Sequence, residues 1–122
     1  SCTAAVGTII STSLDRDSTA VETQDFISAF EAKSGNKTDM VAASAHTAIK
    51  VLAAALQSSG DTDRAALRDA IAGTQLTAST GDISFNDLGE VQKSVQVQVV
   101  KDGQWHHHSV IHDAALLAPP TE

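Results

Sequence analysis

The longest periodic stretch in the sequence constrains the fold most, because it predicts one long helix over about residues 38–58. Apolar residues recur there at spacings of three and four, the period of a helix with one buried face. The predicted buried stripe consists of Val41, Ala45, Ala48, Ile49, Leu52 and Leu56. Alanine fills much of the remainder, so this helix can pack closely on more than one side, and Gly60 is expected to end it.

Two shorter helices are predicted on either side of the long one. Residues 19–34 form the first, in which Thr19 and Glu22 have the spacing of a capping box and Gly35 follows the last turn. Its apolar face consists of Phe26, Ile27 and Phe30. The other helix covers residues 63–72, with Thr62 or Asp61 as its cap and Gly73 as its end. Its buried stripe consists of Leu67, Ala70 and Ile71.

The remaining segments predict short strands at both ends of the chain. Residues 6–12 are β-branched and precede the helices, whereas residues 81–85, 94–100 and 105–111 follow them. We expect residues 76–80 to be a polar loop, residues 86–89 to be a turn, and Asp102-Gly103 to close a hairpin. A strand followed by helices favours a parallel α/β layer, with the hairpin as an antiparallel addition.

Composition excludes several classes of partner. With 122 residues the chain is long enough for one domain. It has 8 basic and 15 acidic residues, a net charge of -7 and no basic cluster, which argues against nucleic acid or an anionic membrane surface as a partner. No run of apolar residues is expected to span a membrane. The single cysteine, Cys2, cannot form an internal disulfide.

Several segments in order resemble one large family. The stretch 41–48 is similar to a helix start that in the family reads Ala-Ala, two residues, Tyr-Asp-Ala, and residues 53–60 resemble the end of that helix. Residues 67–73 resemble the next helix, residues 81–90 resemble a Gly-x-Ile-x-Phe-x-x-x-Gly-Asp element, and residues 97–105 resemble a closing hairpin. The family is that of the periplasmic binding proteins of type I fold, in the branched-chain amino-acid (leucine/isoleucine/valine-like) group.

The resemblance covers residues 5–110 and implies a fold class and a function. The fold would be α/β, the C-terminal third of a type I periplasmic binding protein, with a strand, three helices, a short strand and a C-terminal hairpin. Residues 1–122 would form one incomplete α/β unit that contributes to two lobes, and residues 114–122 would fray. The whole protein would be a periplasmic or extracytoplasmic receptor of an ABC importer. It would close on a small amino acid or related solute and dock on a membrane permease, without catalysis and without a cofactor.

The resemblance and the strand pattern point to three candidate ligand-binding residues. His46 stands where the family usually has Tyr near the cleft wall, and Thr47 replaces the usual Asp. Thr12 and Ser13 lie at the end of the first strand, and ligands collect at the carboxyl ends of strands in open α/β sheets. The alternatives are a partly buried histidine near a helix start and an ordinary polar loop. The family's main contacts to the solute lie upstream of this stretch.

The histidine run 106–108 is a weak candidate for a metal site. Strand alternation would put His106 and His108 on one face, with His112 or Asp113 as a third ligand. A polar edge strand explains the same residues without a metal. Two other hypotheses therefore stay open besides the receptor. One is an α/β interaction domain that self-associates through its helix faces, as a homo-oligomer without solute, and the other is a metal carrier that uses these histidines.

Overall fold

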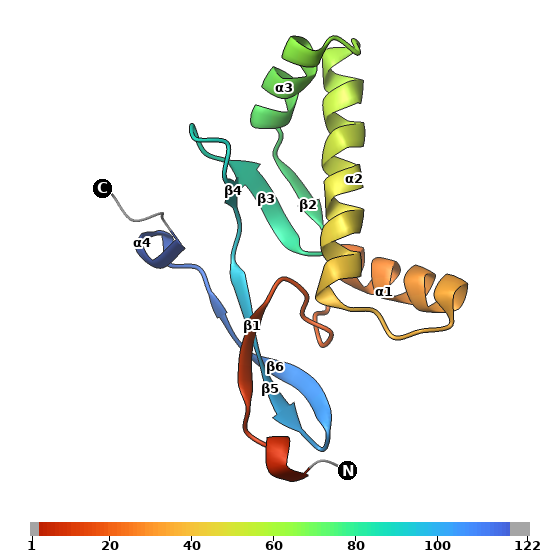
Figure 1. Ribbon diagram of the computed structural model, residues 1–122, viewed down its shortest axis with the longest axis vertical. Helices are drawn as coiled ribbons and strands as arrows, with labels where there is room; N and C mark the ends of the chain where they lie inside the picture. The colour runs from red at the N-terminus through yellow and green to blue at the C-terminus, as the bar shows by residue number, and fades with distance from the viewer. Residues whose placement is uncertain (1–2, 118–122) are drawn as a thin grey trace.

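The structure is a computed structural model that describes residues 3–117, and it has two parts (Figure 1). The upper part in the figure holds three helices and a small sheet, and the lower part holds a second sheet. The upper elements are α1 (Val21–Ser34), α2 (Met40–Ser59), α3 (Arg64–Ala72), β2 (Leu76–Ala78), β3 (Gly81–Phe85) and β4 (Val91–Gln92). The lower sheet consists of β1 (Ile9–Thr12), β5 (Val95–Lys101) and β6 (Gln104–Ile111), and the ends carry the short helices η1 (Thr3–Ala5) and α4 (Ala114–Leu117).

The chain passes between the two parts twice. Residues 13–20 lead from β1 up to α1, and residues 93–94 lead from β4 back down to β5 (Figure 1). We call these the first and the second crossing segment. They touch each other, because the Lys93 ammonium donates a hydrogen bond to the Ser13 hydroxyl. The first strand and the closing hairpin therefore lie together, although the helices separate them in sequence.

The lower sheet is antiparallel throughout, in the order β1-β5-β6. The prediction of a parallel layer is therefore wrong for residues 3–117, in which every strand pairing is antiparallel. The reason is that β1 pairs with the first strand of the hairpin, which returns through the second crossing segment in the opposite direction. The predicted hairpin turn is confirmed: Asp102 and Gly103 have φ values of 52° and 77°, the left-handed backbone that a tight two-residue turn needs.

A register irregularity interrupts the hairpin. Val97 faces Ser109 and Gln98 faces His107, so that His108 has no partner residue on β5. This is the geometry of a bulge, in which one strand carries an extra residue and bends. The simple alternation predicted for residues 94–100 and 105–111 is therefore wrong at this point. The predicted alternation puts Gln98 on the polar face of its strand, away from the valines, but its side chain is buried.

Helix α2 has two unlike faces, and the predicted buried stripe lies on the exposed one. The inner face packs toward the rest of the upper part and consists of Ala43, Thr47, Val51 and Ala55. The outer face is apolar but exposed and consists of Val41, Ile49, Leu52 and Leu56. Exposure reaches 69% for Val41 and 64% for Ile49. The Asp39 side chain caps the start of the helix at the Ala42 N–H, 2.8 Å away, and Gly60 ends it as expected.

Helix α2 also meets a simple criterion for a membrane span. It has a mean hydropathy of 1.3, enough by length and composition to cross a membrane, which corrects the expectation that the chain has no such segment. The core helix of a soluble protein meets the same criterion. Packing of its inner face against the upper part gives the helix a partner within the chain.

Helix α1 begins differently from the prediction but packs as expected. Its N-cap is Ala20 without a side-chain hydrogen bond, so the capping box of Thr19 and Glu22 is wrong. Phe26 is buried with Leu14 and Ala43, and Ile27 and Phe30 pack against this cluster, which confirms the predicted apolar face. Gly35 ends the helix.

The chain after α2 differs from the prediction in its caps and strands. Asp63, rather than Thr62 or Asp61, caps α3 by accepting hydrogen bonds from the Ala65 and Ala66 N–H groups. The predicted stripe of α3 is only half-buried. Residues 76–80, predicted as a loop, form β2 and a two-residue turn that pairs β2 with β3. β4 was not predicted, whereas the turn at residues 86–89 is confirmed by a Gly89 N–H to Asn86 carbonyl bond of 2.9 Å.

The predicted frayed tail falls only partly on described residues. Residues 114–117 of it form α4. Residues 118–122 and Cys2 lie outside the described residues.

Candidate functional site

A buried hydroxyl cluster joins α2 to the β2–β3 turn. Ser79 and Thr80 occupy that turn and are 2% and 3% exposed. The Thr47 hydroxyl lies 3.3 Å from that of Ser79 and 3.0 Å from that of Thr80. The Ser79 hydroxyl also donates to the Ala43 carbonyl, and its own carbonyl accepts from Thr23 on α1. These bonds satisfy the polar groups that burial would otherwise leave unpaired.

His46 lies at the edge of this hydroxyl cluster. Its ring stacks on Phe26 with the centroids 4.7 Å apart, and its Nδ1 lies 3.3 Å from the Ser79 hydroxyl. Burial, and next to it the positive charge of Lys50, lowers the pKa of His46 below its usual value. The histidine is therefore a neutral hydrogen-bonding group at neutral pH. The same ring lines a separate hollow of about 510 Å³ between α1 and α2, together with Phe30 and Lys33.

Ser13 lies where the two crossing segments meet. Its hydroxyl accepts from Lys93, and burial lowers the pKa of that lysine. Ser13 lines a hollow of about 250 Å³ between the two parts of the molecule. Hydroxyl groups dominate its lining: Ser13, Ser18, Thr23, Thr77, Ser79, Thr80 and Ser94. We call it the hydroxyl hollow. The carboxylates of Asp15 and Asp82 also line it. Such a lining suits neutral polar groups and cations, because each hydroxyl can donate or accept and the carboxylates attract positive charge.

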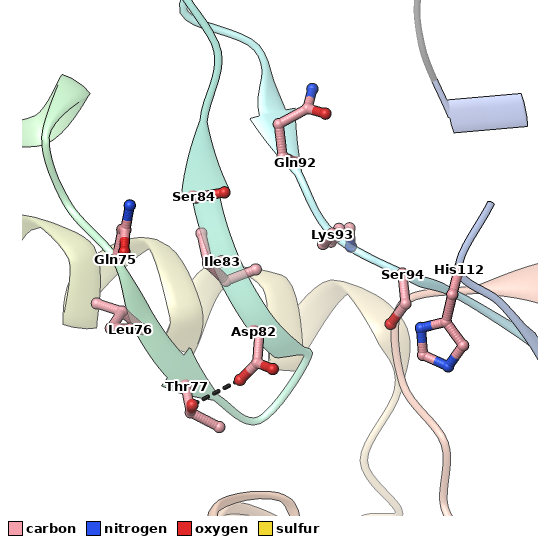
Figure 2. A pocket seen from close by; sticks show the side chains of 10 residues that line it. All are labelled: Gln75, Leu76, Thr77, Asp82, Ile83, Ser84, Gln92, Lys93, Ser94 and His112. Carbon is pink, nitrogen blue, oxygen red and sulfur yellow. Dashed lines mark hydrogen bonds between the residues drawn. The ribbon is translucent and has the colours of Figure 1, made fainter. Parts of the chain in front are cut away.

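A larger hollow of about 580 Å³ adjoins the hydroxyl hollow and shares Thr77, Asp82 and Ser94 with it. Figure 2 shows Asp82 on β3, with the Thr77 hydroxyl 2.6 Å from its carboxylate, and Lys93, Ser94 and His112 across from it. The wall therefore carries a carboxylate on one side and a half-buried ammonium on the other. This charge distribution is complementary to a small solute that bears both an anionic and a cationic group.

The structure does not bring the three predicted ligand residues into one hollow. Ser13 lines the hydroxyl hollow, and His46 reaches the wall of that hollow only through Ser79. Thr12 accepts a hydrogen bond from the Leu14 N–H and lines another hollow of about 240 Å³, beside Arg16. Their role in binding stays a prediction.

Sequence reasoning missed the turn Ser79–Thr80 and Lys93. The only signal for the turn was the run of serines and threonines at residues 74–80, which indicates a loop as readily as a binding wall. No pattern around Lys93 marks it as half-buried.

The histidine run is arranged differently from the predicted metal site. His106 and His107 both contact the first crossing segment, at Asp17 and Asp15. His108 is the extra residue of the bulge, so the regular alternation that would place it on one face with His106 is interrupted. Within residues 3–117, no three His, Cys, Asp or Glu side chains are grouped so that they could hold a metal ion.

The comparisons with known proteins agree with this architecture. A family model described as periplasmic binding protein matches residues 1–104. Among curated proteins, no relative matches the chain.

Several solved structures are similar in fold. A leucine-binding protein from Thermotoga maritima has 25% identity and a TM-score of 0.79 over 90% of this chain and 32% of its own. A substrate-binding protein of an ABC transporter from Desulfitobacterium hafniense, in complex with Leu, has 25% identity and a TM-score of 0.78 over 85% and 32%. A solute-binding protein from R. palustris in complex with benzoate has 20% identity and a TM-score of 0.80 over 93% and 33%.

The chain spans about a third of the length of each of these structures. The family model, by contrast, covers most of the chain. The fold that it adopts, a mixed α/β arrangement of two small sheets and helices, matches a third of a type I periplasmic binding protein. This chain belongs to the periplasmic binding protein family.

Proposed function

We propose that the chain is part of an extracytoplasmic solute receptor of an ABC importer. The observation that carries the proposal is the family match over residues 1–104. The architecture agrees with it, because polar hollows lie where the two parts of the molecule meet at the crossing segments. The proposed activity is reversible binding, with no bond made or broken. A membrane permease is the proposed partner of the whole protein, and the periplasm or another extracytoplasmic space is its location.

The proposed ligand is a small amino acid or a related solute. Two similar structures are described with Leu and with benzoate, and both molecules carry a carboxylate. The Ser94 hydroxyl and the Lys93 ammonium would donate hydrogen bonds to such a group, and Asp82 would accept from an amino group of the solute. The Ser13 hydroxyl lines the adjoining hollow. Thr12 and His46 are further proposed contacts. The two parts would close on the solute by bending at the crossing segments.

A binding experiment on the full chain tests the proposal. Leucine, valine, benzoate and an amide are added in turn while backbone amide signals are followed by NMR. We expect dissociation constants on the order of millimolar, since this chain supplies only part of the contacts of a closed cleft. The signals that move should belong to residues 12–18, 77–82 and 93–96.

Two serine variants sharpen that experiment. Ser13→Ala should weaken binding severalfold, whereas Ser58→Ala, on the exposed part of α2 away from the hollow, should not. The proposal is wrong for these solutes if no signal moves, or if the shifts are spread evenly over the surface.

The second candidate function is self-association without a solute, and the outer face of α2 favours it. Four large apolar side chains are exposed on one helix there, and such a face commonly marks an interaction surface. Light scattering over a range of concentrations tests this candidate. A dimer that dissociates on Ile49→Lys, but not on the exposed control Thr19→Lys, would support it, and a monomer at every concentration would exclude it.

A further inference from the structure

Two aspartates of the first crossing segment are held by two histidines of the hairpin. The Asp15 carboxylate lies 2.6 Å from Nδ1 of His107, and the Asp17 carboxylate lies 3.2 Å from Nδ1 of His106. The same oxygen of Asp17 accepts a hydrogen bond from the backbone N–H of His107, at 2.8 Å. We call these four residues the clasp. The clasp joins residues far apart in sequence and lies outside the hydroxyl cluster described above.

His106 and His107 both reach the first crossing segment although they are adjacent on β6, where they pair in regular register with Val99 and Gln98. The bulge residue His108 follows them. Asp15 also accepts from the Asp17 backbone N–H, at 3.0 Å, so the two carboxylates are fixed relative to each other.

Other charged groups lie near the clasp. Asp15 itself lines the hydroxyl hollow together with Asp82, a carboxylate of β3. Arg16 lies between the two aspartates in sequence, but its guanidinium donates to the Gln98 side chain and to the Thr38 carbonyl. On β5, the residues opposite His107 and His106 are Gln98 and Val99, which do not titrate. Asp39, at the start of α2, is engaged as a helix cap.

We propose that the clasp is a proton-dependent device that positions the first crossing segment on the hairpin. Imidazoles ordinarily gain their proton near pH 6.5, and carboxylates keep their charge down to about pH 4. A protonated imidazole beside an ionised carboxylate makes a charge-assisted hydrogen bond, which is stronger than the bond that a neutral imidazole makes.

The consequence concerns the residues that the segment carries. Ser13 lines the hydroxyl hollow, and Leu14 is fully buried in the core with Phe26. Mild acid would therefore hold Ser13 and Leu14 more firmly relative to the lower sheet. An effect of this on solute affinity rests on the proposed function, whereas the positioning itself does not.

Hydrogen exchange of the full chain tests the positioning directly. Backbone amides of residues 14–18 are compared at about pH 5.5 and pH 8, each corrected for the chemical exchange rate of an unfolded chain. We expect at least about threefold greater protection at the lower pH, the effect of two partly exposed ion pairs. The hydrogen bonds within α2, which do not touch the clasp, serve as the internal reference.

Matched variants separate the clasp from general acid effects. The double variant Asp15→Asn and Asp17→Asn should lose the pH-dependent protection, whereas Asp87→Asn, which removes a carboxylate from the exposed 86–89 turn, should keep it. The double variant His106→Gln and His107→Gln provides a second test if the aspartate variant does not fold. Protection that is equal at both pH values in the unaltered chain, or that survives in the histidine variant, would overturn the proposal.

Discussion

The two faces of helix α2 differ both in the size of their side chains and in what covers them. The inner face carries mostly small residues, and Ala43, Thr47 and Ala55 pack tightly against the upper part. The outer face carries larger apolar residues such as Ile49 and Leu56, and none of the described residues buries them. Close approach favours small side chains, whereas large apolar side chains gain most from being buried.

This difference teaches that the apolar pattern of a helix does not by itself identify its partner. The outer face has the apolar composition typical of a buried surface, yet its side chains are exposed to solvent. Exposed apolar side chains gathered on one face commonly mark an interaction surface. The four predictions that follow test this difference, from the largest expected effect to the smallest.

A charge placed on each face should give the largest contrast. Val51→Asp puts a carboxylate on the buried inner face and should lower the free energy of unfolding by about 3 kcal/mol. Ile49→Asp puts the same group on the outer face and should change it by less than about 0.5 kcal/mol. Urea unfolding followed by circular dichroism measures both. Equal losses would mean that the outer face is covered in solution.

Removing one hydroxyl from the inner face should have a smaller effect. Thr47→Val keeps the shape of the side chain but removes the hydroxyl that pairs with Thr80 and one of the partners of Ser79, which should cost about 1–2 kcal/mol. The control is Thr19→Val, at an exposed position before α1. A stability unchanged from the unaltered chain would show that the hydroxyl cluster does not hold α2 to the β2–β3 turn.

The cap at the start of α2 should contribute less to the stability of the fold than the hydroxyl cluster does. Asp39→Ala removes the acceptor for the Ala42 N–H and should lower stability by about 1 kcal/mol. Asp87→Ala is the matched control on an exposed turn. Thermal unfolding of the two variants under the same conditions makes the comparison, and a loss of equal size in both would contradict the cap.

Lowering the pH should destabilise the fold slightly through His46, which lies at the border of the inner face of α2. Its pKa is lowered in the folded chain, so the unfolded chain takes up a proton first as pH falls. The stabilisation is therefore complete above pH 6.5, the value for the free side chain, and is lost as pH falls through the lower folded pKa. His46→Phe keeps a ring on Phe26 but cannot titrate, so its melting temperature should fall less between about pH 7.5 and 5.

The His46→Phe comparison is best repeated in the His106→Gln, His107→Gln background, because these two histidines also contact carboxylates. A slope that is identical with and without His46 would contradict the assigned direction.

Local signals predicted most of the helices and the hairpin. Periodicity located all three long helices within a few residues, because their apolar spacing and following glycines are local features. Asp102-Gly103 likewise determines its turn through backbone conformation alone. The family resemblance found from ordered motifs is confirmed by the family model.

The misses arise from contacts between distant segments. β1 pairs with β5, whose position depends on the second crossing segment, so its antiparallel direction has no local signal. The β2–β3 turn uses Ser79 and Thr80 in place of the usual turn residues, because their hydroxyls bond to α2. The bulge at His108 equally escapes any rule of strand alternation. For the same reason, the sequence predicted single candidate residues of the site but not which of them share a hollow.

The paired crossing segments have a mechanical consequence. Two neighbouring points of attachment define a line, and rotation about that line disturbs fewer contacts than sliding or twisting of one part against the other. The Lys93–Ser13 bond lies where the two attachments meet, so it sits close to this line and need not break when the angle between the parts changes. This line is the hinge that the proposed closure on a solute would use.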